Sequence, residues 1–465
     1  MPARPSGAVH APLPSAGTEV PFSVRHFLQK GCAMHSRDSA FTLLAKPESR
    51  IVAANFLMQL GLQAIYFVGI IGCATYDLGA DALVVSSLVL VLNVMLVVMS
   101  FVAGPLVDAV GPRRTLAVTL SVMAVAGLAG WLLPLSYGLL YALAAVQGAA
   151  FGVGSTSMDA YPRFVSDDPR YLQRVNSLVY TATSVAVIAG PALGGLIVSA
   201  LPTKCDFAIM AFASLPAIAL VWSTVEKIVP SRQRAAAGEA CAAGTMGAGD
   251  GDARPKARPA GGARGFLADL AEGVRITWES EGLRMLFLIG FLGFFAYGAF
   301  DSLESLFYRD VLRAGAQWMG WLSAISGVGG TLGSLAVLRI PQRRLDMTAL
   351  SAMLLVTGLG SMLYVGTGSI AWACVGQLVC GLGFGAMGPT RTTLTQARCD
   401  VSHVGRVTSV MRVGMNSAGV LPLFVAPFLA DAFGVQAVLF GASTMVAVVA
   451  VAFVARTRTR RESLG

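Results

Sequence analysis

Twelve long apolar stretches follow one another along the chain from Ile51 to Val454. A helix needs about 20 mostly apolar residues to cross the hydrocarbon core of a bilayer, and each stretch is about that long. None alternates apolar with polar residues as barrel strands do, and backbone groups in lipid must find partners within their own segment. The pattern therefore predicts twelve membrane helices, at 51–74, 82–104, 115–134, 137–159, 175–200, 206–225, 284–307, 317–338, 347–366, 369–391, 407–431 and 435–455.

A hydrophilic segment rich in Ala, Gly, Arg and Pro divides the stretches six and six, and such a composition is typical of a flexible linker. The end of this segment interleaves apolar and charged residues at helical spacing. It predicts an amphipathic helix that either lies on the inner membrane surface or packs against cytoplasmic loops. We expect five parts: a mostly disordered cytoplasmic tail (1–50), a six-helix bundle (51–225), a cytoplasmic linker (226–283), a second six-helix bundle (284–455) and a basic cytoplasmic tail (456–465).

The distribution of charge supports this arrangement. Hydrophobic residues make up 55% of the chain and charged residues 13%, so lipid must surround most of it. Basic residues gather in alternate loops, for example at Arg113 and Arg114, in the linker and in the C-terminal tail. Because short basic loops stay in the cytoplasm, we expect a multi-pass protein of the cell (inner or plasma) membrane with both termini cytoplasmic. The net charge of +9 then reports topology and anionic inner lipids, not a nucleic-acid partner.

The two halves resemble each other at a nearly constant offset. Arg-Val-Asn-Ser at 174–177 recurs as Arg-Val-Thr-Ser at 406–409, Arg-Arg at 113–114 recurs at 343–344, and Phe-Gly at 151–152 recurs at 384–385. Two six-helix halves related by an axis along the membrane normal are the plan of a rocker-type carrier, with the substrate site between them near mid-membrane. The predicted fold is therefore an all-α membrane protein of two pseudo-symmetric six-helix bundles.

The sequence offers little support for other chemistry. It contains no Gly-Lys-Ser/Thr of a phosphate-binding loop, so we expect neither ATP hydrolysis nor any enzymatic activity. The seven cysteines are scattered without Cys-x-x-Cys spacing, which indicates neither a metal site nor a disulfide framework. We expect no cofactor, a proton gradient as the energy source, and a monomer whose partners are a small-molecule substrate, protons and the lipid bilayer.

The loop after the second stretch carries a family signature. Gly104, Asp108, Gly111, Arg113 and Arg114 stand at spacings that resemble the signature loop of the major facilitator superfamily. The resemblance extends over essentially the whole chain from 51 to 454 and implies the major facilitator fold. Glycines permit close approach and tight turns. The resemblance also places the Asp108 carboxylate at the positive N-terminus of the eleventh helix, where it favours the state closed to the cytoplasm.

The signature is incomplete, since positions 109 and 112 hold Ala and Pro where the family usually has basic residues. We therefore expect Asp108 to have fewer basic neighbours in this loop than it usually has in the family. The alternative interpretation of this loop is an ordinary basic loop at the cytoplasmic face, without a conformational role.

The fifth stretch contains Gly190, Pro191, Gly194 and Gly195, which match the core of the family's antiporter motif, found mostly in exporters. Glycines allow tight helix packing and proline bends the helix, although an ordinary kinked helix has the same features. In the fourth stretch, Ala144 stands where drug/proton antiporters often have an arginine, so proton coupling through that arginine is not expected. The sequences Pro-Arg-Phe-Val at 162–165 and Arg-Val-Asn-Ser at 174–177, around these two stretches, resemble the macrolide-efflux and enterobactin-exporter branch of the family.

Two acids, Asp301 and Glu304, lie near the end of the seventh stretch, and their spacing places both carboxylates near one helix face. A charge deep in a membrane helix costs at least about 2.5–3.5 kcal/mol, so such residues tend to face water or a partner. Either is a candidate proton-binding acid. Equally, both are candidates for solvated groups at the membrane interface.

Asp159 and Arg391 are separated by the same offset as the repeat, so they occupy equivalent positions at the inner ends of the fourth and tenth helices. By resemblance these helices line the cavity, and the two charges are a candidate cytoplasmic gate. The alternative is that both are unpaired charges at a wet helix end.

Polar residues form a stripe on the first stretch, and such a stripe should face the cavity rather than lipid. The candidate substrate-binding residues are Asn55, Gln59, Gln63, Tyr66 and, in the eleventh stretch, Arg412. The alternative for Arg412 is that it extends to the cytoplasmic surface.

The sequence and the resemblance together predict a secondary active transporter that exports a small, moderately hydrophobic molecule or drug by proton antiport, and so confers drug resistance through efflux. Two alternatives stay open. One is an importer or uniporter of a sugar or organic acid, and the other is a transport-dead sensor or assembly protein on the same scaffold.

Overall fold

The computed structural model describes residues 46–166, 168–225, 263–341, 344–398 and 404–464, and the chain from Pro47 onward forms one compact unit. The expected N-terminal tail up to residue 45, the linker at 226–262 and Arg343 lie outside the described residues. Twelve of the described helices are long and apolar enough to span a membrane.

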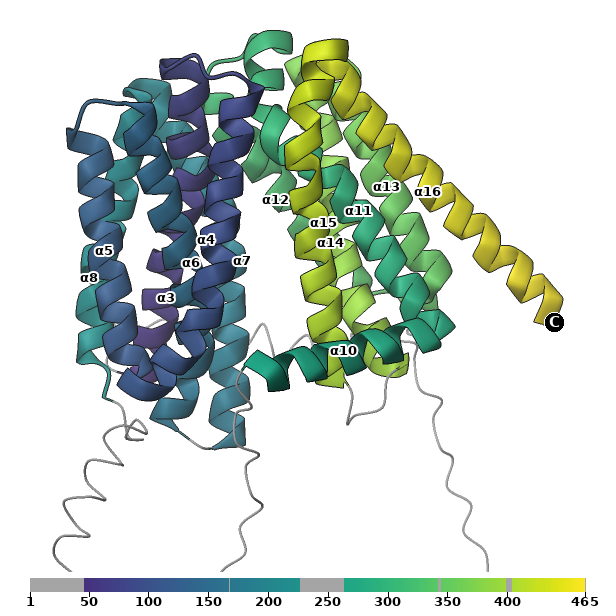
Figure 1. Cartoon of the computed structure of the whole chain (residues 1–465), viewed down its shortest axis with the longest axis horizontal. Coiled ribbons are helices and arrows are strands. Elements are labelled where there is room, and N and C mark those ends of the chain that lie inside the picture. Colours follow the sequence, from purple (N-terminus) through teal and green to yellow (C-terminus); the bar gives the residue numbers. More distant parts are fainter. Residues whose placement is uncertain (1–45, 167, 226–262, 342–343, 399–403, 465) are drawn as a thin grey trace, which may run out of the picture. The chain divides into compact units, whose positions relative to one another are not determined.

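Helices form the first half of the compact unit (Figure 1). They are α3 (Pro47–Ala64), η1 (Ile65–Asp77), α4 (Ala82–Val110), α5 (Pro112–Leu132), α6 (Tyr137–Val165), α7 (Pro169–Ala200), η2 (Thr203–Asp206) and α8 (Phe207–Ser223). The second half comprises α10 (Ala263–Glu279), α11 (Glu281–Leu306), η3 (Phe307–Val311), α12 (Gln317–Val337), α13 (Met347–Val365), α14 (Ile370–Arg398), α15 (Val404–Phe433) and α16 (Val435–Leu464).

Local sequence explains where several helices begin. The side chains of Asp81, Ser136 and Asp346 each accept a hydrogen bond from the backbone N–H three residues later, which caps α4, α6 and α13. Several helices run past the predicted spans, α6 to Val165 and α14 to Arg398, because a helix does not have to stop where the lipid does. The apolar pattern therefore located the helices but not their full lengths.

The first membrane helix differs from the sequence prediction of one regular helix. It is α-helical to Ala64 and π-helical from Ile65 to Asp77. Two glycines in the π-helical part, Gly69 and Gly72, lie against Asp206 and Thr203 at the start of the sixth membrane helix. Such π-helical segments occur frequently at functional sites.

The two halves pack their helices in matching pairs. In the first half α3 contacts α7, α4 contacts α6, and α5 contacts α8; in the second half α11 contacts α15, α12 contacts α14, and α13 contacts α16. The repeated Phe-Gly follows the same rule, since Gly152 on α6 faces α4 and Gly385 on α14 faces α12. These pairings are those of two pseudo-symmetric six-helix bundles.

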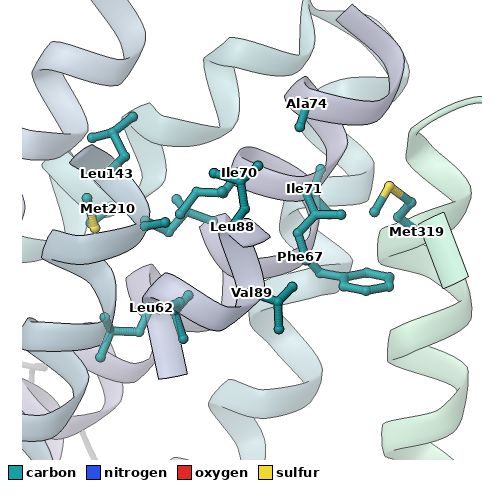
Figure 2. Packing of buried hydrophobic residues seen from close by; sticks show 14 of the residues in the cluster. Leu62, Phe67, Ile70, Ile71, Ala74, Leu88, Val89, Leu143, Met210 and Met319 are labelled. Atoms are coloured by element: carbon teal, nitrogen blue, oxygen red, sulfur yellow. The ribbon is translucent and has the colours of Figure 1, made fainter. Parts of the chain in front are cut away.

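Buried apolar side chains fill the first half and continue into the second. Leu62, Ile70, Leu88 and Met210 pack within the first half, and Met319 from α12 lies beside Phe67 (Figure 2). Many large apolar side chains elsewhere stay exposed, for example Val125 at 67% and Phe428 at 62%. Such exposure suits a surface that lipid covers.

The second-half helix α10 fits the predicted amphipathic helix. It contacts α15 and α11 and crosses the ends of the second-half helices (Figure 1). Thr277 is fully buried, whereas Val274 and Trp278 are 44% and 48% exposed. Packing against the helix bundle therefore uses one side of α10 and leaves an apolar side uncovered.

Candidate functional site

The membrane helices have two ends, which we name by residues that lie there. Because α4 runs from Ala82 to Val110, Tyr76 before it and Arg113 after it lie at opposite ends, the Tyr76 end and the Arg113 end. The described hydrogen bonds between the two halves gather at the Tyr76 end. The Thr75 hydroxyl donates to the Ser305 hydroxyl at 3.0 Å, and the Tyr76 hydroxyl donates to the Ala314 carbonyl at 2.9 Å.

Arg309 adds two more bonds between the halves. Its Nη1 donates to the carbonyls of Thr75 and Ala80 at 3.0 and 3.1 Å, while its Nε and Nη2 bind the adjacent Asp310. The guanidinium thereby binds one carbonyl in the last turn of η1 and one in the connection that follows it. We call Thr75, Tyr76, Ser305 and Arg309 the Tyr76-end contact.

The glycines of the fifth-helix motif divide between two neighbours. Gly190 faces residues 60–64 of α3, whereas Gly195 faces α12 of the other half. A Cβ at Gly195 would lie 2.8 Å from the Gln317 carbonyl oxygen, and a Cβ at Gly320 would collide with the Pro191 carbonyl. The motif thus brings the α7 and α12 backbones into direct contact across the two halves.

A polar cluster surrounds Glu304 in the second half. The Glu304 Oε1 accepts hydrogen bonds from the Tyr364 hydroxyl at 2.7 Å, Gln377 Nε2 at 2.8 Å and the Tyr308 hydroxyl at 2.9 Å. These donors lie on α13, α14 and η3, so one carboxyl joins the end of α11 to two other helices. The Glu304 side chain is half-buried, and its assignment as the proton-binding acid stays a prediction.

Aromatic rings enclose this cluster. Tyr364 packs against Phe300, Phe307 and Tyr308, with ring centroids 5.4–6.1 Å apart. The Tyr308 ring meets Phe67 of the first half edge to face at 6.3 Å. Glu304 is therefore one layer behind the contact between the halves, and its neighbour Ser305 belongs to the Tyr76-end contact.

The second predicted acid, Asp301, is half-buried one turn before Glu304. The Tyr66 hydroxyl lies close enough to both carboxyls for their charges to act on it. Tyr297, one turn earlier on α11, lies 3.6 Å from the Cys380 sulfur, which also lies 3.3 Å from the Ser361 hydroxyl. The acids thus adjoin a chain of polar side chains that extends into the second half.

The predicted polar stripe on the first helix divides into two parts. Asn55 is 1% exposed, and its Nδ2 donates to the Thr183 hydroxyl at 2.8 Å and the Val179 carbonyl at 3.2 Å. This placement argues against Asn55 as a substrate ligand, because its amide joins α3 to α7. Gln59 is also buried, and its Oε1 has no hydrogen-bond partner among the described residues. Gln63 and Tyr66 are half-buried.

The signature loop lies at the Arg113 end. Gly111 has φ 96° and ψ 150°, a conformation that glycine alone adopts readily. The Arg113 guanidinium lies 4.9 Å from the Trp222 ring centroid and donates to the Trp222 carbonyl. Asp108 and Arg114 are exposed. A Cβ at Gly104 would meet no atom of the described residues within 4 Å.

The candidate gate residues lie on the expected helices. Asp159 is exposed on α6, and Arg391 is half-buried on α14, where its Nη1 contacts the Met415 sulfur of α15. The gate stays a prediction. The Arg412 side chain lies outside the described residues, so its predicted role is likewise untested.

The structure adds residues that the sequence reasoning did not select. Tyr308, Tyr364 and Gln377 hold Glu304, and a lone amide in an apolar helix was the available signal for Gln377. Gln147 of α6 likewise donates from its Nε2 to the Leu62 carbonyl at 2.5 Å. The α6–α3 pair and the α14–α11 pair therefore each contain a glutamine that binds the first helix of its half.

Comparison with known proteins agrees with this architecture. The family model described as Major Facilitator Superfamily matches residues 51–423 and 350–465. The chain is 28% identical over 357 residues to proteins named "Multidrug efflux pump Tap" from Mycobacterium tuberculosis (strain H37Rv) and Mycobacterium bovis (strain BCG / Pasteur), covering 73% of this chain and 76% of each relative.

Solved structures show the same fold at low identity. The nucleoside transporter NupG superposes with a TM-score of 0.65 at 12% identity, covering 88% of this chain and 99% of that chain. A peptide transporter POT in complex with sulfate superposes with a TM-score of 0.64 at 14% identity, covering 93% and 98%. The chain therefore belongs to the major facilitator superfamily and is a membrane transporter rather than an enzyme.

Proposed function

We propose that this protein is a secondary active exporter of a small, moderately hydrophobic molecule or drug, driven by proton antiport with rocker-switch alternating access. The position of Glu304 carries the proposal. One turn of α11 contains a carboxyl held by three donors and a serine that bonds across the two halves. A change in the proton occupancy of this carboxyl therefore acts directly beside the contact that must open and close.

The two oxygens of Glu304 have different surroundings. Three donors fix Oε1, whereas Oε2 receives no hydrogen bond from the described residues, and we place the transported proton there. Protonation removes a charge that is costly inside a membrane helix. It also weakens the pull of the carboxylate on the Tyr308 and Tyr364 hydroxyls, since hydrogen bonds to an ionised acceptor are stronger.

A proton supplies enough free energy for useful export. One charge crossing about 100 mV provides about 2.3 kcal/mol, and each tenfold concentration gradient costs about 1.4 kcal/mol. One proton per substrate therefore supports a gradient of about 40-fold.

We assign the Tyr76 end to the outer face and the Arg113 end to the cytoplasm of the cell membrane, because basic loops stay inside. Both termini are then cytoplasmic, and the conformation described above is closed to the outside. Asp108 and the candidate gate pair Asp159 and Arg391 would act in the opposite conformation. Cysteines replacing Arg113 and Arg343 should both react with a reagent supplied from the cytoplasm; labelling from opposite sides would contradict the twofold plan.

Aromatic side chains support an apolar substrate. Gln377, Phe384 and Arg391 share the face of α14 that meets α11, and Phe384 is 41% exposed beside Tyr297 and Phe294. Rings bind apolar molecules through contact area and impose little directional selection, as in other mostly apolar pockets. The relatives named multidrug efflux pumps agree with this substrate class.

A drug-susceptibility panel tests the proposal in cells that express the protein. Wild type should raise the growth-inhibiting concentration of at least one apolar drug, and Glu304→Gln should abolish that protection, because the amide cannot release a proton. Asp431→Asn is the matched control, since Asp431 is exposed on α15. Equal protection by wild type and Glu304→Gln would refute proton coupling through Glu304.

Transport direction needs a separate measurement. Substrate counterflow in vesicles of defined orientation should follow an imposed pH gradient with substrate and proton moving in opposite directions. Movement in the same direction would favour the importer. Absence of any flux, together with fixed accessibility of cysteines at both ends, would favour a sensor on the same scaffold.

A further inference from the structure

A second carboxyl group lies buried in the first half of the protein. Asp206 ends η2 directly before α8, and none of its surface is exposed. Neither carboxyl oxygen has a hydrogen-bond partner of ordinary geometry among the described residues. The backbone N–H of Gly69 lies close enough to interact with it. The transport mechanism above does not use this acid.

Two glycines on different helices make room for the carboxyl. Its Oδ1 lies 2.8 Å from the position that a Cβ would take at Gly194 of α7, and its Oδ2 lies 3.2 Å from the same position at Gly69 of η1. Both distances are shorter than an ordinary van der Waals contact of a Cβ atom, which is 3.4–4 Å. A residue with a side chain at Gly194 would therefore have to displace the Asp206 carboxyl, which gives this motif glycine a specific partner.

The carboxyl also lies directly behind the contact between the two halves. Gly194 faces Asp206, and the next residue, Gly195, faces Gln317 and Gly320 of α12. The methyl group of Thr203, three residues before Asp206, lies 3.4 Å from the Cβ position at Gly72, which also faces Met319 of α12. Any movement that separates α7 and η1 from α12 therefore begins one residue away from the walls of the Asp206 pocket.

The surroundings offer this acid little compensation for a negative charge. A carboxylate taken from water without a partner is strongly disfavoured relative to the neutral acid. The facing segments of α7 (190–200), α5 (126–132) and α8 contain no titratable side chain, and α3 carries its charged residues at its opposite end. The titratable or charged groups on the remaining packed elements are Tyr66, Cys73, Tyr76 and Asp77 of η1 and Lys204 and Cys205 of η2.

We propose that Asp206 is a second proton-binding site, which retains its proton while the Tyr76 end is closed and exchanges it with water when that end opens. In the exchange the carboxyl O–H bond breaks, a water molecule accepts the proton as hydronium, and the carboxylate left behind is hydrated. The proposal rests on the alternating access of the proposed function but requires neither export nor proton binding at Glu304. Its role is to make closure of the Tyr76 end depend on an occupied proton site.

Infrared spectroscopy of the purified full chain in lipid tests this assignment. Wild type should give a carboxylic acid C=O band that is absent from Asp206→Asn and retained in Glu304→Gln. A disulfide between Thr75→Cys and Ser305→Cys, positions whose hydroxyls lie 3.0 Å apart, holds the Tyr76 end closed. In the locked protein the band should persist from acidic to alkaline buffer, and after reduction it should titrate.

Other outcomes overturn the proposal. Identical spectra of wild type and Asp206→Asn would mean that Asp206 holds no proton, and equal titration of the locked and reduced proteins would mean that opening does not control it. If Asp206→Asn fails to fold, Gly194→Ala provides the second test, because its Cβ should shift the frequency of the same band. An unshifted band would contradict the assignment. Loss of transport in Glu304→Gln with the Asp206 band intact would separate the two proton sites.

Discussion

The contact between α7 and α12 permits a quantitative prediction about conformational balance. Gly320 of α12 lies so close to Pro191 and Gly195 that an added Cβ would strike backbone atoms, including the Gly195 Cα at 2.6 Å. Gly320→Ala should therefore destabilise the conformation closed at the Tyr76 end. It should affect the open conformation much less, because α7 and α12 separate there.

The expected magnitude follows from the cost of overpacking. Forcing an extra methyl group into a tightly packed contact typically costs about 1–3 kcal/mol. A penalty confined to one of two conformations changes their ratio by about 5- to 150-fold. Gly330→Ala is the matched control on the same helix, because its Cβ would meet its nearest atom at an ordinary 3.7 Å.

Cysteine accessibility measures this shift. Ser305 is 1% exposed, so Ser305→Cys should react with a water-soluble maleimide only when the Tyr76 end opens. Labelling at position 305 is followed by mass spectrometry. It should be about 5- to 150-fold faster in the Gly320→Ala background and unchanged in the Gly330→Ala background. Equal rates in both backgrounds would refute the claim that this crossing controls the closed conformation.

Three further predictions follow from individual contacts. Arg309→Gln removes donors to the Thr75 and Ala80 carbonyls, so it should raise maleimide labelling at position 305 by about 10- to 150-fold, for a charged hydrogen bond worth about 1.5–3 kcal/mol; unchanged labelling would exclude Arg309 from the contact. Gly111→Ala should lower the thermal unfolding midpoint, because its φ of 96° costs a side chain about 1–3 kcal/mol, whereas a midpoint equal to that of wild type would contradict the assigned turn. Asn55→Leu should reduce stability by about 1–3 kcal/mol and leave the range of exported drugs unchanged; a changed range with unchanged stability would restore Asn55 as a substrate ligand.

The apolar pattern of the sequence determined the helices closely. Predicted spans such as 137–159 and 317–338 correspond to α6 (Tyr137–Val165) and α12 (Gln317–Val337). This success has a simple cause, since a bilayer demands about 20 apolar residues in every crossing and admits only helices that satisfy their own backbone. The nearly constant spacing between the repeated motifs of the two halves likewise predicted that their helices pack in matching pairs.

The polar residues were harder to interpret from sequence. Periodicity placed Asn55 and Tyr66 on one stripe, but Asn55 bonds to α7 whereas Tyr66 lies near the two acids of α11. The first membrane helix also changes from α-helix to π-helix at Ile65, so residues beyond that point no longer follow the spacing of 3.6 per turn. No local feature of the sequence signalled that change.

By itself, then, the sequence determined the number and position of the membrane helices, the twofold plan and the family, because each depends on local composition or on short motifs. Only the tertiary structure decided which acids are enclosed and by what. Glu304 receives donors from positions 60 and 73 residues away, and Asp206 occupies space left by Gly69 and Gly194 on two other helices. The surroundings of a buried charge depend on side chains that only helix packing brings together, and those surroundings set what its ionisation costs.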